Sequence, residues 1–140
     1  MDLENEKCVI IIDEYLPRGI IANTAAILGT TIGSKMPDIV GDDVVDSSGN
    51  SHAGIIQFPV PILKGNKQLL KDIRTMLFEP RFDDLTVVDF SDLAQGCKTY
   101  DEFIVKMADS PEENINYIGI AICGSRKKVN KLTGSIPLLR

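Results

Sequence analysis

The chain has 140 residues and a formal net charge of −5; 44% of its residues are apolar and 25% are charged. These proportions are typical of a globular protein, and the length suits a single domain over residues 1–140. The acidic balance excludes a broad nucleic-acid surface, because such surfaces draw most of their binding energy from Lys and Arg. No apolar run reaches the ~20 residues of a membrane-spanning helix, so we expect no membrane partner.

The N-terminus and the cysteines indicate a reducing compartment. The first seven residues are polar and acidic, whereas a secretory signal begins basic and continues apolar. The three scattered cysteines, Cys8, Cys97 and Cys123, fit free thiols better than a disulfide framework. We therefore expect a cytoplasmic protein in which Cys8 and Cys123 are buried as small apolar side chains.

The first two predicted elements are a buried strand and an uncharged helix. Cys8–Ile12 is a continuous run rich in β-branched residues, typical of a strand covered on both faces. Between Ile20 and Ile32, apolar residues recur at helical spacing and no charge interrupts them. The small residues in this helix favour close approach to a sheet or to another chain.

Strands and helices alternate along the rest of the chain. The prolines at 59 and 61 place the strand that contains them at an edge or a bulge, because proline cannot donate to a ladder. Thr99 and Glu102 match a capping box, which opens a helix with Phe103, Ile104 and Met107 inward. The further elements expected are strands at 44–45, 55–63, 84–90 and 117–123 and helices at 67–78, 99–107 and 125–133.

This order predicts an α/β fold. Strands that alternate with helices favour a three-layer α/β/α arrangement around a mixed, mostly parallel sheet of four or more strands. The unbroken apolar character of residues 8–12, 86–89 and 117–122 predicts that these three strands are central.

The two ends of the chain resemble the type II peptidyl-tRNA hydrolases. Ile120–Ser125 and Val129–Leu139 are similar to their final strand, their short helix carrying Asp-Lys-Val-Thr-Gly, and their terminal Leu-Lys-Leu. Leu16, Gly19 and the Ala-rich helix resemble their N-terminal Asp-Leu-x-Met-Gly-x-Gly-Lys motif. The whole chain is closer still to a bacterial family of uncharacterised proteins related to these enzymes by fold. The resemblance implies a hydrolase-like fold and a homodimer.

Departures from the hydrolase pattern argue against the same activity. Ala22 stands where the enzymes carry a lysine, and alanine cannot stabilise an ester oxyanion. Asp89 matches the first residue of their Asp-Ala-Gly-x-Thr motif, but the glycine and threonine are missing. We therefore expect no appreciable cleavage of peptidyl-tRNA.

Two candidate sites remain. Asp89 is the candidate catalytic residue, expected at the end of a strand where open α/β sheets bind ligands, with Asn23 as a ligand-binding residue facing the same cleft. Alternatively, Asp89 caps a turn and Asn23 is simply exposed. A turn and helix start follow the last strand, and their free N–H groups and cations favour an anion. This second site comprises Gly124, Ser125, Arg126 and Lys127. Alternatively, its cations are only a solvated helix face.

Three functions are compatible with these residues. The first is a non-hydrolytic protein that binds a small anionic or peptide-like ligand. The second is a hydrolase that acts on an ester or amide with a different residue set, such as Asp89 with Asn23. The third is a structural or interaction protein in which the apolar first helix forms a dimer face. The lone His52 has no partner at ligand spacing, so we expect neither a metal nor a cofactor.

Overall fold

The computed structural model describes all residues except Met1 and Leu3. The described chain forms a four-stranded sheet, a two-stranded hairpin and five α-helices. The strands are β1 (Glu6–Asp13), β2 (Val44–Val45), β3 (Ser51–His52), β4 (Ile62–Gly65), β5 (Thr86–Ser91) and β6 (Tyr117–Ser125). The helices are α1 (Arg18–Lys35), α2 (Lys67–Leu77), α3 (Asp92–Gly96), α4 (Tyr100–Ala108) and α5 (Arg126–Thr133). None of these helices is both long and apolar enough to cross a membrane.

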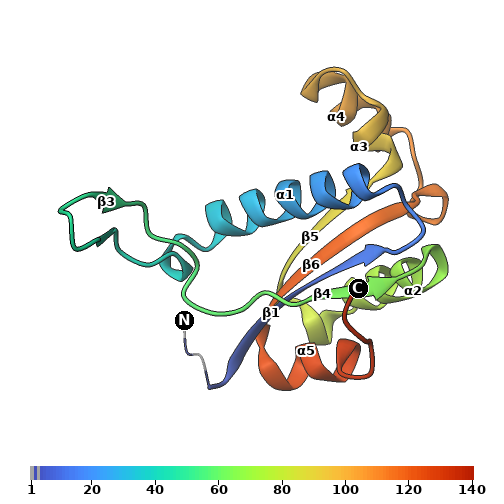
Figure 1. The fold of residues 1–140 in the computed structure, drawn as a ribbon. Helices are drawn as coiled ribbons and strands as arrows, with labels where there is room; N and C mark the ends of the chain where they lie inside the picture. Colours follow the sequence, from blue (N-terminus) through green and yellow to red (C-terminus); the bar gives the residue numbers. More distant parts are fainter. Residues whose placement is uncertain (1, 3) are drawn as a thin grey trace.

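The main sheet has the strand order β4-β1-β6-β5 (Figure 1). Strand β1 pairs in parallel with β4, whereas β6 runs antiparallel to both of its neighbours, β1 and β5. The sheet is mixed, as expected, but most of its pairing is antiparallel. The prediction of a mostly parallel sheet is therefore wrong.

The path between β5 and β6 explains this difference. In a crossover unit, a helix packs on the sheet and returns the chain to its starting end, so the next strand is parallel. Here β5 ends at Ser91 and β6 begins at Tyr117, its partner across the ladder. Helices α3 and α4 lie beyond the end of the sheet (Figure 1), so the chain re-enters at the end it left and runs back antiparallel.

The predicted strands differ in how central they are. Cys8–Ile12 and Tyr117–Ile122 lie in the two central strands and are almost fully buried, as expected. Strand β5 lies at an edge, so the prediction that residues 86–89 are central is wrong. The strand predicted over 55–63 begins only at Ile62, beyond both prolines, which have no N–H for a ladder.

Helix α1 covers one face of the sheet. Its buried residues, Thr24, Leu28 and Ile32, pack over β1, β5 and β6. The closest approach is at Gly119 of β6, where a Cβ atom would lie 2.7 Å from Cγ2 of Thr24 and 3.1 Å from Cδ1 of Leu28. The glycine therefore sets how closely the helix approaches the sheet.

Helices α2 and α5 cover the opposite face. The side chain of Asn66 accepts a hydrogen bond from the N–H of Leu69 at 2.8 Å and so caps the start of α2. The inner surfaces of these two helices pack against the odd-numbered side chains of β1. Their buried residues are Leu70, Ile73 and Leu77 of α2 and Val129 and Thr133 of α5.

The two edges of the sheet differ. At the β4 edge, the N–H of Lys64 donates to the C=O of Pro137 at 2.9 Å, and the N–H of Leu139 donates to the C=O of Ile62 at 2.8 Å. The C-terminal segment thus covers that edge. At the other edge, no strand within the described part of the chain pairs with the outer side of β5.

Residues 41–55 form a hairpin that we call the arm, and it projects from the body of the molecule (Figure 1). Oδ1 of Asp46 accepts from the N–H groups of Ser48 and Asn50, and Oδ2 lies 2.8 Å from Nε2 of His52. These contacts order the hairpin although it is exposed. Three large apolar side chains of the arm are exposed, namely Val44 (60%), Val45 (68%) and Ile55 (79%).

The cysteines only partly meet expectation. Cys8 and Cys123 are buried, as expected, and face each other across β1 and β6. Their sulfur atoms are joined in a disulfide, so the prediction of free thiols is wrong for this pair. The sequence did not reveal this bond, because the pairing depends on the register of two strands whose cysteines lie 115 residues apart. Cys97 is a free thiol.

Candidate ligand-binding site

The open edge of β5 carries unpaired main-chain groups in an alternating pattern. The N–H of Ile10 donates to the C=O of Pro61, so even-numbered residues of β1 face β4 and odd-numbered residues face β6. Ile120 of β6 pairs with Ile11, an odd-numbered residue of β1. The N–H and C=O of Ile120 therefore point toward β1 and away from β5. Its partner on β5, Asp89, therefore points its N–H and C=O outward, and so does Val87.

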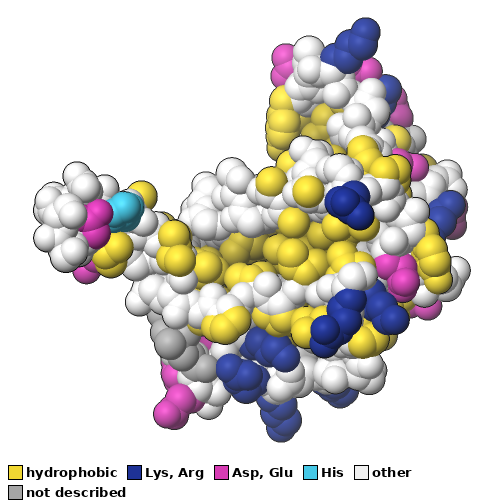
Figure 2. All heavy atoms as spheres, viewed as in Figure 1, with side chains coloured by type: hydrophobic (Ala, Val, Ile, Leu, Met, Phe, Trp, Pro, Cys, Tyr) yellow, Lys and Arg dark blue, Asp and Glu magenta, His cyan; other side chains and the backbone are white. Residues whose placement is uncertain are grey.

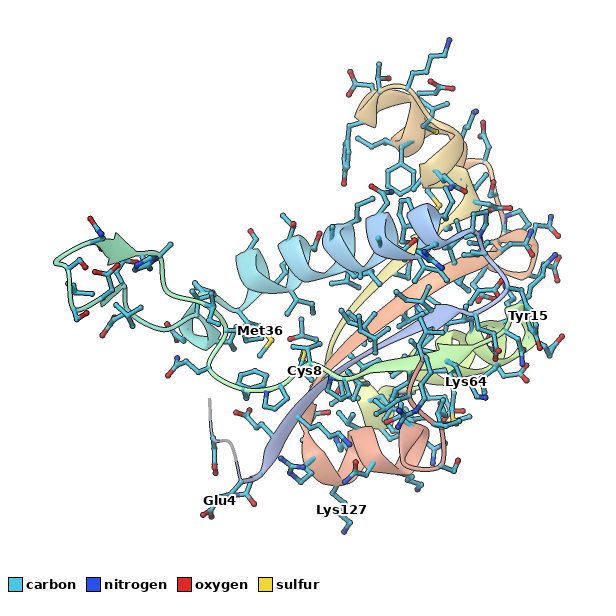
Figure 3. All side chains as sticks on the ribbon, in the orientation of Figure 1. Glu4, Cys8, Tyr15, Met36, Lys64 and Lys127 are labelled. Atoms are coloured by element: carbon cyan, nitrogen blue, oxygen red, sulfur yellow. A yellow bond between two sulfur atoms is a disulfide. The ribbon has the colours of Figure 1, made fainter. Side chains whose placement is uncertain are left out.

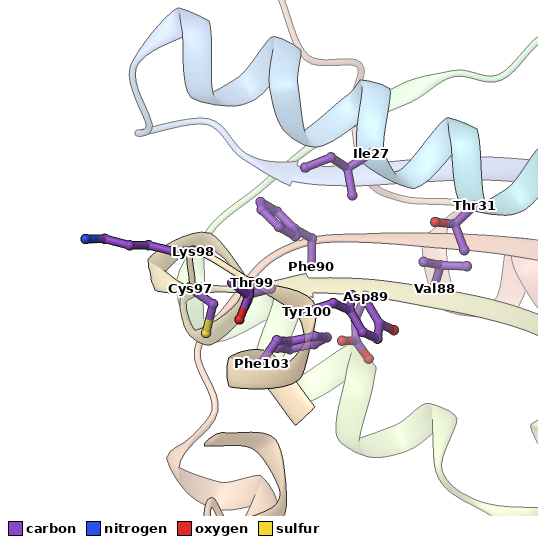
Figure 4. Close-up of a pocket in the computed structure, with 11 residues that line it drawn as sticks. Ile27, Thr31, Val88, Asp89, Phe90, Cys97, Lys98, Thr99, Tyr100 and Phe103 are labelled. Carbon is purple, nitrogen blue, oxygen red and sulfur yellow. The ribbon is translucent and has the colours of Figure 1, made fainter. Parts of the chain in front are cut away.

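A groove of about 420 Å³ runs beside this edge (Figure 4). Helix α1 contributes Ile27 and Thr31 to one side, α4 contributes Tyr100 and Phe103 to the other, and Phe90 of β5 lies between them. The groove is mainly apolar, with polar groups at its ends. Its lining also includes Val88, Asp89, Ala94, Cys97, Lys98 and Thr99.

Two helix caps hold the α4 side of the groove in place. The hydroxyl of Ser91 accepts from the N–H of Ala94 at the start of α3, and the hydroxyl of Thr99 accepts from the N–H of Glu102 at the start of α4. Serine and threonine favour such positions because their short side chains satisfy free N–H groups of the first turn. The capping residues therefore fix where α3 and α4 begin.

Asp89 lies within β5 and not at its end, where it was expected, because the strand continues to Ser91. Its Oδ2 accepts a hydrogen bond of 2.7 Å from Nε of Arg74, and both side chains are largely buried, at 22% and 13% exposure. The guanidinium of Arg74 also stacks on the ring of Phe78, 3.8 Å from its centroid. Arg74 thus fixes the position of the Asp89 carboxylate on the α2 side of the edge.

The structure does not bring the predicted site residues together. Asn23 lies exposed on α1 and does not line the groove. Gly124 lies near Leu85 at the start of β5, whereas Asp89 pairs with Ile120 farther along the strand. Because β6 runs antiparallel, its carboxyl end lies at the opposite end of the sheet from that of β5. The expected cleft between Asn23, Asp89 and Gly124 is therefore absent from the described chain.

The residues after Gly124 have mostly structural partners. Gly124 has a φ of 147°, and a Cβ there would lie 2.7 Å from Cδ2 of Leu85. The N–H of Arg126 donates to the C=O of Asn5 at 2.7 Å, and its Nε donates to the C=O of Glu4 at 3.0 Å. The hydroxyl of Ser125 caps α5 by accepting from the N–H of its third residue. Arg126 therefore ties the N-terminal segment to α5.

A second hollow, of about 280 Å³, lies beside α5, and we call it the basic hollow. Lys128 donates to Oδ1 of Asp84 at 2.7 Å, and this hydrogen bond lowers the pKa of Asp84. Arg81 pairs with Glu79, whereas no ion pair is formed by Lys127 or Lys131 among the described residues. The lining residues are Arg81, Phe82, Ser125, Lys127, Lys128 and Lys131.

Sequence reasoning missed most of the groove. Ile27 and Thr31 looked like ordinary positions of a core helix, and the α4 helix was expected to turn Ile104 inward. The structure leaves Ile104 54% exposed and directs Phe103 to the groove. The apolar residues at 100–108 were the available signal, but they equally fit a helix packed on the sheet. Among the described residues, no three His, Cys, Asp or Glu side chains cluster closely enough to hold a metal.

These features define a small α/β protein with one covered sheet edge, one open edge and a groove beside it. Residues 6–140 match the family model described as "Protein of unknown function (DUF2000)", and the chain belongs to that family. A solved structure of a protein of unknown function from Agrobacterium tumefaciens strain C58 is similar, with a TM-score of 0.85 and 19% identity over 96% of this chain and 97% of that one. This likeness shows a shared fold. Comparison with curated proteins gives no significant match.

Proposed function

We propose that the protein binds an extended, peptide-like ligand as an additional strand on β5. The observation that carries this proposal is the set of outward N–H and C=O groups of Val87 and Asp89 beside a preformed groove. Added strands obtain affinity from main-chain hydrogen bonds and specificity from pockets for alternate side chains. The resemblance at the two chain ends also favours a ligand of this kind.

The groove supplies the specificity. Side chains of an added strand alternate between the two faces of the sheet. Those on the α1 face would enter the apolar space between Ile27, Phe90 and Phe103, which suits aliphatic or aromatic residues. Those on the other face would meet the Asp89–Arg74 pair, which suits polar or basic residues. In this proposal Asp89 orients the ligand, and no catalytic role is assigned to it.

A titration with a strand-forming peptide tests the proposal. The probe is acetyl-Lys-Thr-Phe-Thr-Val-Thr-Lys-amide, which places its two apolar residues on one face. We expect saturable binding by isothermal titration calorimetry. We expect Phe103→Ala to weaken it about tenfold, equivalent to ~1.4 kcal/mol, because one side of the groove is lost.

The matched control is Ile104→Ala on the same helix, since Ile104 is exposed and does not line the groove. The proposal is contradicted if the two variants bind the probe equally well. It is also contradicted if the unmodified protein binds neither this probe nor a randomised peptide library of the same length.

A second candidate function is the binding of a small anion in the basic hollow. The supporting observation is the convergence of Arg81, Lys127, Lys128 and Lys131 around a concave surface beside Ser125. Titration with inorganic phosphate, followed by amide shifts at 125–131, tests it. Shifts that are absent at millimolar phosphate, or that persist in Lys127→Ala/Lys131→Ala, contradict it.

The remaining expectations stay proposals. We propose that the fold is the three-layer arrangement of the type II peptidyl-tRNA hydrolases and that the protein is a homodimer. Helices on both faces of the sheet support the first. The expected cytoplasmic location loses the support of free thiols at Cys8 and Cys123. Catalysis on an ester or amide by Asp89 with Asn23 gains no support, because Asn23 lies outside the groove.

A further inference from the structure

The arm and α5 carry opposite charge. Residues 41–55 contain Asp42, Asp43 and Asp46 and neither Lys nor Arg. Helix α5 contains four cations, Arg126, Lys127, Lys128 and Lys131, and no carboxylate. In a chain of net charge −5, the two segments are therefore biased in opposite directions.

The arm also exposes apolar surface, and the basic hollow offers aliphatic atoms. The arm presents Val44, Val45 and Ile55, each more than half exposed. The aliphatic stems of the lysines line the basic hollow beneath their charged groups, over the buried Phe82. Figure 2 shows apolar side chains on the projecting arm with acidic atoms beside them, and Lys and Arg side chains along the lower surface of the body.

The arm can project from the body because hydrogen bonds between its own residues hold its conformation. The two backbone segments at its base come into contact at Gly41 and Gly54. A Cβ on Gly54 would lie 1.8 Å from the C=O oxygen of Gly41. Oδ1 of Asp43 accepts from the N–H of Gly54 at 2.9 Å. An ordered hairpin that exposes three large apolar side chains is typical of a segment held by another surface.

We propose that the arm of one chain docks in the basic hollow of a second copy of the same chain. This deepens the second candidate function, since it names the carboxylates of the arm as the anions that the hollow receives. It also places the dimer interface on the arm and α5, and not on α1 as the sequence suggested.

A reciprocal, closed dimer is compatible with where the two segments lie. The base of the arm packs near the start of β1, where Ile39 and Val40 line an apolar hollow with Cys8. Helix α5 also begins there, since the N–H of Arg126 donates to the C=O of Asn5. Figures 1 and 3 show the arm and α5 at the same end of the sheet, with Lys127 labelled on the lower surface. Two patches at one end can contact each other twice across a two-fold axis.

Apolar burial would supply most of the affinity, and the charges would set its salt dependence, because exposed ion pairs are screened beyond about 8–10 Å at physiological salt. Sedimentation velocity at micromolar concentration is the test, and we expect a dimer. We expect Val44→Ser/Val45→Ser, and separately Lys127→Glu/Lys131→Glu, to raise the dissociation constant at least about tenfold.

Two matched controls keep the test specific. Ile104→Ser/Val105→Ser removes two exposed apolar side chains from α4, and Lys64→Glu/Lys67→Glu makes the same charge change away from α5. Both control proteins should remain dimers. Mixing the arm variant with the α5 variant leaves one intact arm and one intact hollow per pair, so the mixture should associate more strongly than either variant alone.

A monomeric unmodified protein overturns the proposal, and so does a dimer that survives both the arm and the α5 substitutions. The same experiments distinguish a failure of the small-anion function from a failure of arm docking. If phosphate shifts residues 125–131 but the arm variant still dimerises, only the docking of the arm is wrong. If no phosphate binds while the arm variant loses the dimer and mixing restores association, the docking stands and the small-anion function is wrong.

Discussion

At the scale of single residues, Gly119 is a position where the sheet has no room for a side chain. A Cβ there would press on Thr24 and Leu28 of α1, both fully buried. We expect Gly119→Ala to destabilise the protein by about 1–3 kcal/mol, the range typical of overpacked cores. Gly29→Ala is the matched control, because a Cβ there meets nothing within 4 Å. It should be neutral or stabilise the helix by up to about 1 kcal/mol, measured by urea denaturation. Equal losses for both would show that α1 does not pack as described.

Individual residue roles were only partly predictable from the sequence. The burial of Cys8 and Cys123 followed from their apolar neighbours, but their disulfide needed the register of two distant strands. Asp89 was chosen as a candidate site residue from its position at the expected end of a strand and from its match to the first residue of the hydrolase motif. Its partner Arg74 lies on α2, fifteen residues away, and no local pattern joined the two residues.

At the scale of elements, the arm should respond to acid before the rest of the fold. The hydrogen bond from His52 is the main cause that holds the pKa of Asp46 below its ordinary value of 3.8, and bonds from the Asn50 and Ser48 amides add to it. A depressed carboxyl pKa contributes stability above the unfolded pKa and loses it as the pH falls through the folded pKa. We therefore expect the amides of Ser48 and Asn50 to lose protection below about pH 4.

Hydrogen exchange on Asp46→Ala checks this assignment. The variant should show fast exchange at Ser48 and Asn50 at every pH, while the core strands keep their protection. Unchanged exchange in the variant would mean that Asp46 does not order the arm.

The elements themselves were mostly evident from the sequence. β-Branched runs marked β1 and β6, and helical periodicity marked α1 and α2, because those segments bury a continuous apolar stripe or face. The prediction was wrong where a segment leaves the body, as with Ile104 on α4. Periodicity reports an apolar face, but it does not say whether that face meets the sheet, a ligand or another chain.

At the scale of the whole molecule, strand direction was the main feature that the sequence left open. An alternating order of strands and helices favours parallel crossovers, and nothing local in residues 92–116 reveals that α3 and α4 leave the sheet. The consequence concerns the sheet edge. Because β6 returns directly beside β5, β5 becomes an edge strand, and the groove beside it becomes available.

The central claim is that a ligand pairs with the outer side of β5, and hydrogen exchange of four adjacent amides tests it most directly. In the free protein, the N–H groups of Val88 and Phe90 bond to β6 and should exchange slowly, whereas those of Val87 and Asp89 point outward and should exchange fast. Saturation with the acetyl-Lys-Thr-Phe-Thr-Val-Thr-Lys-amide probe should slow exchange at Val87 and Asp89 while Val88 and Phe90 stay unchanged. Binding of the probe with Val87 and Asp89 still exchanging fast would contradict the account.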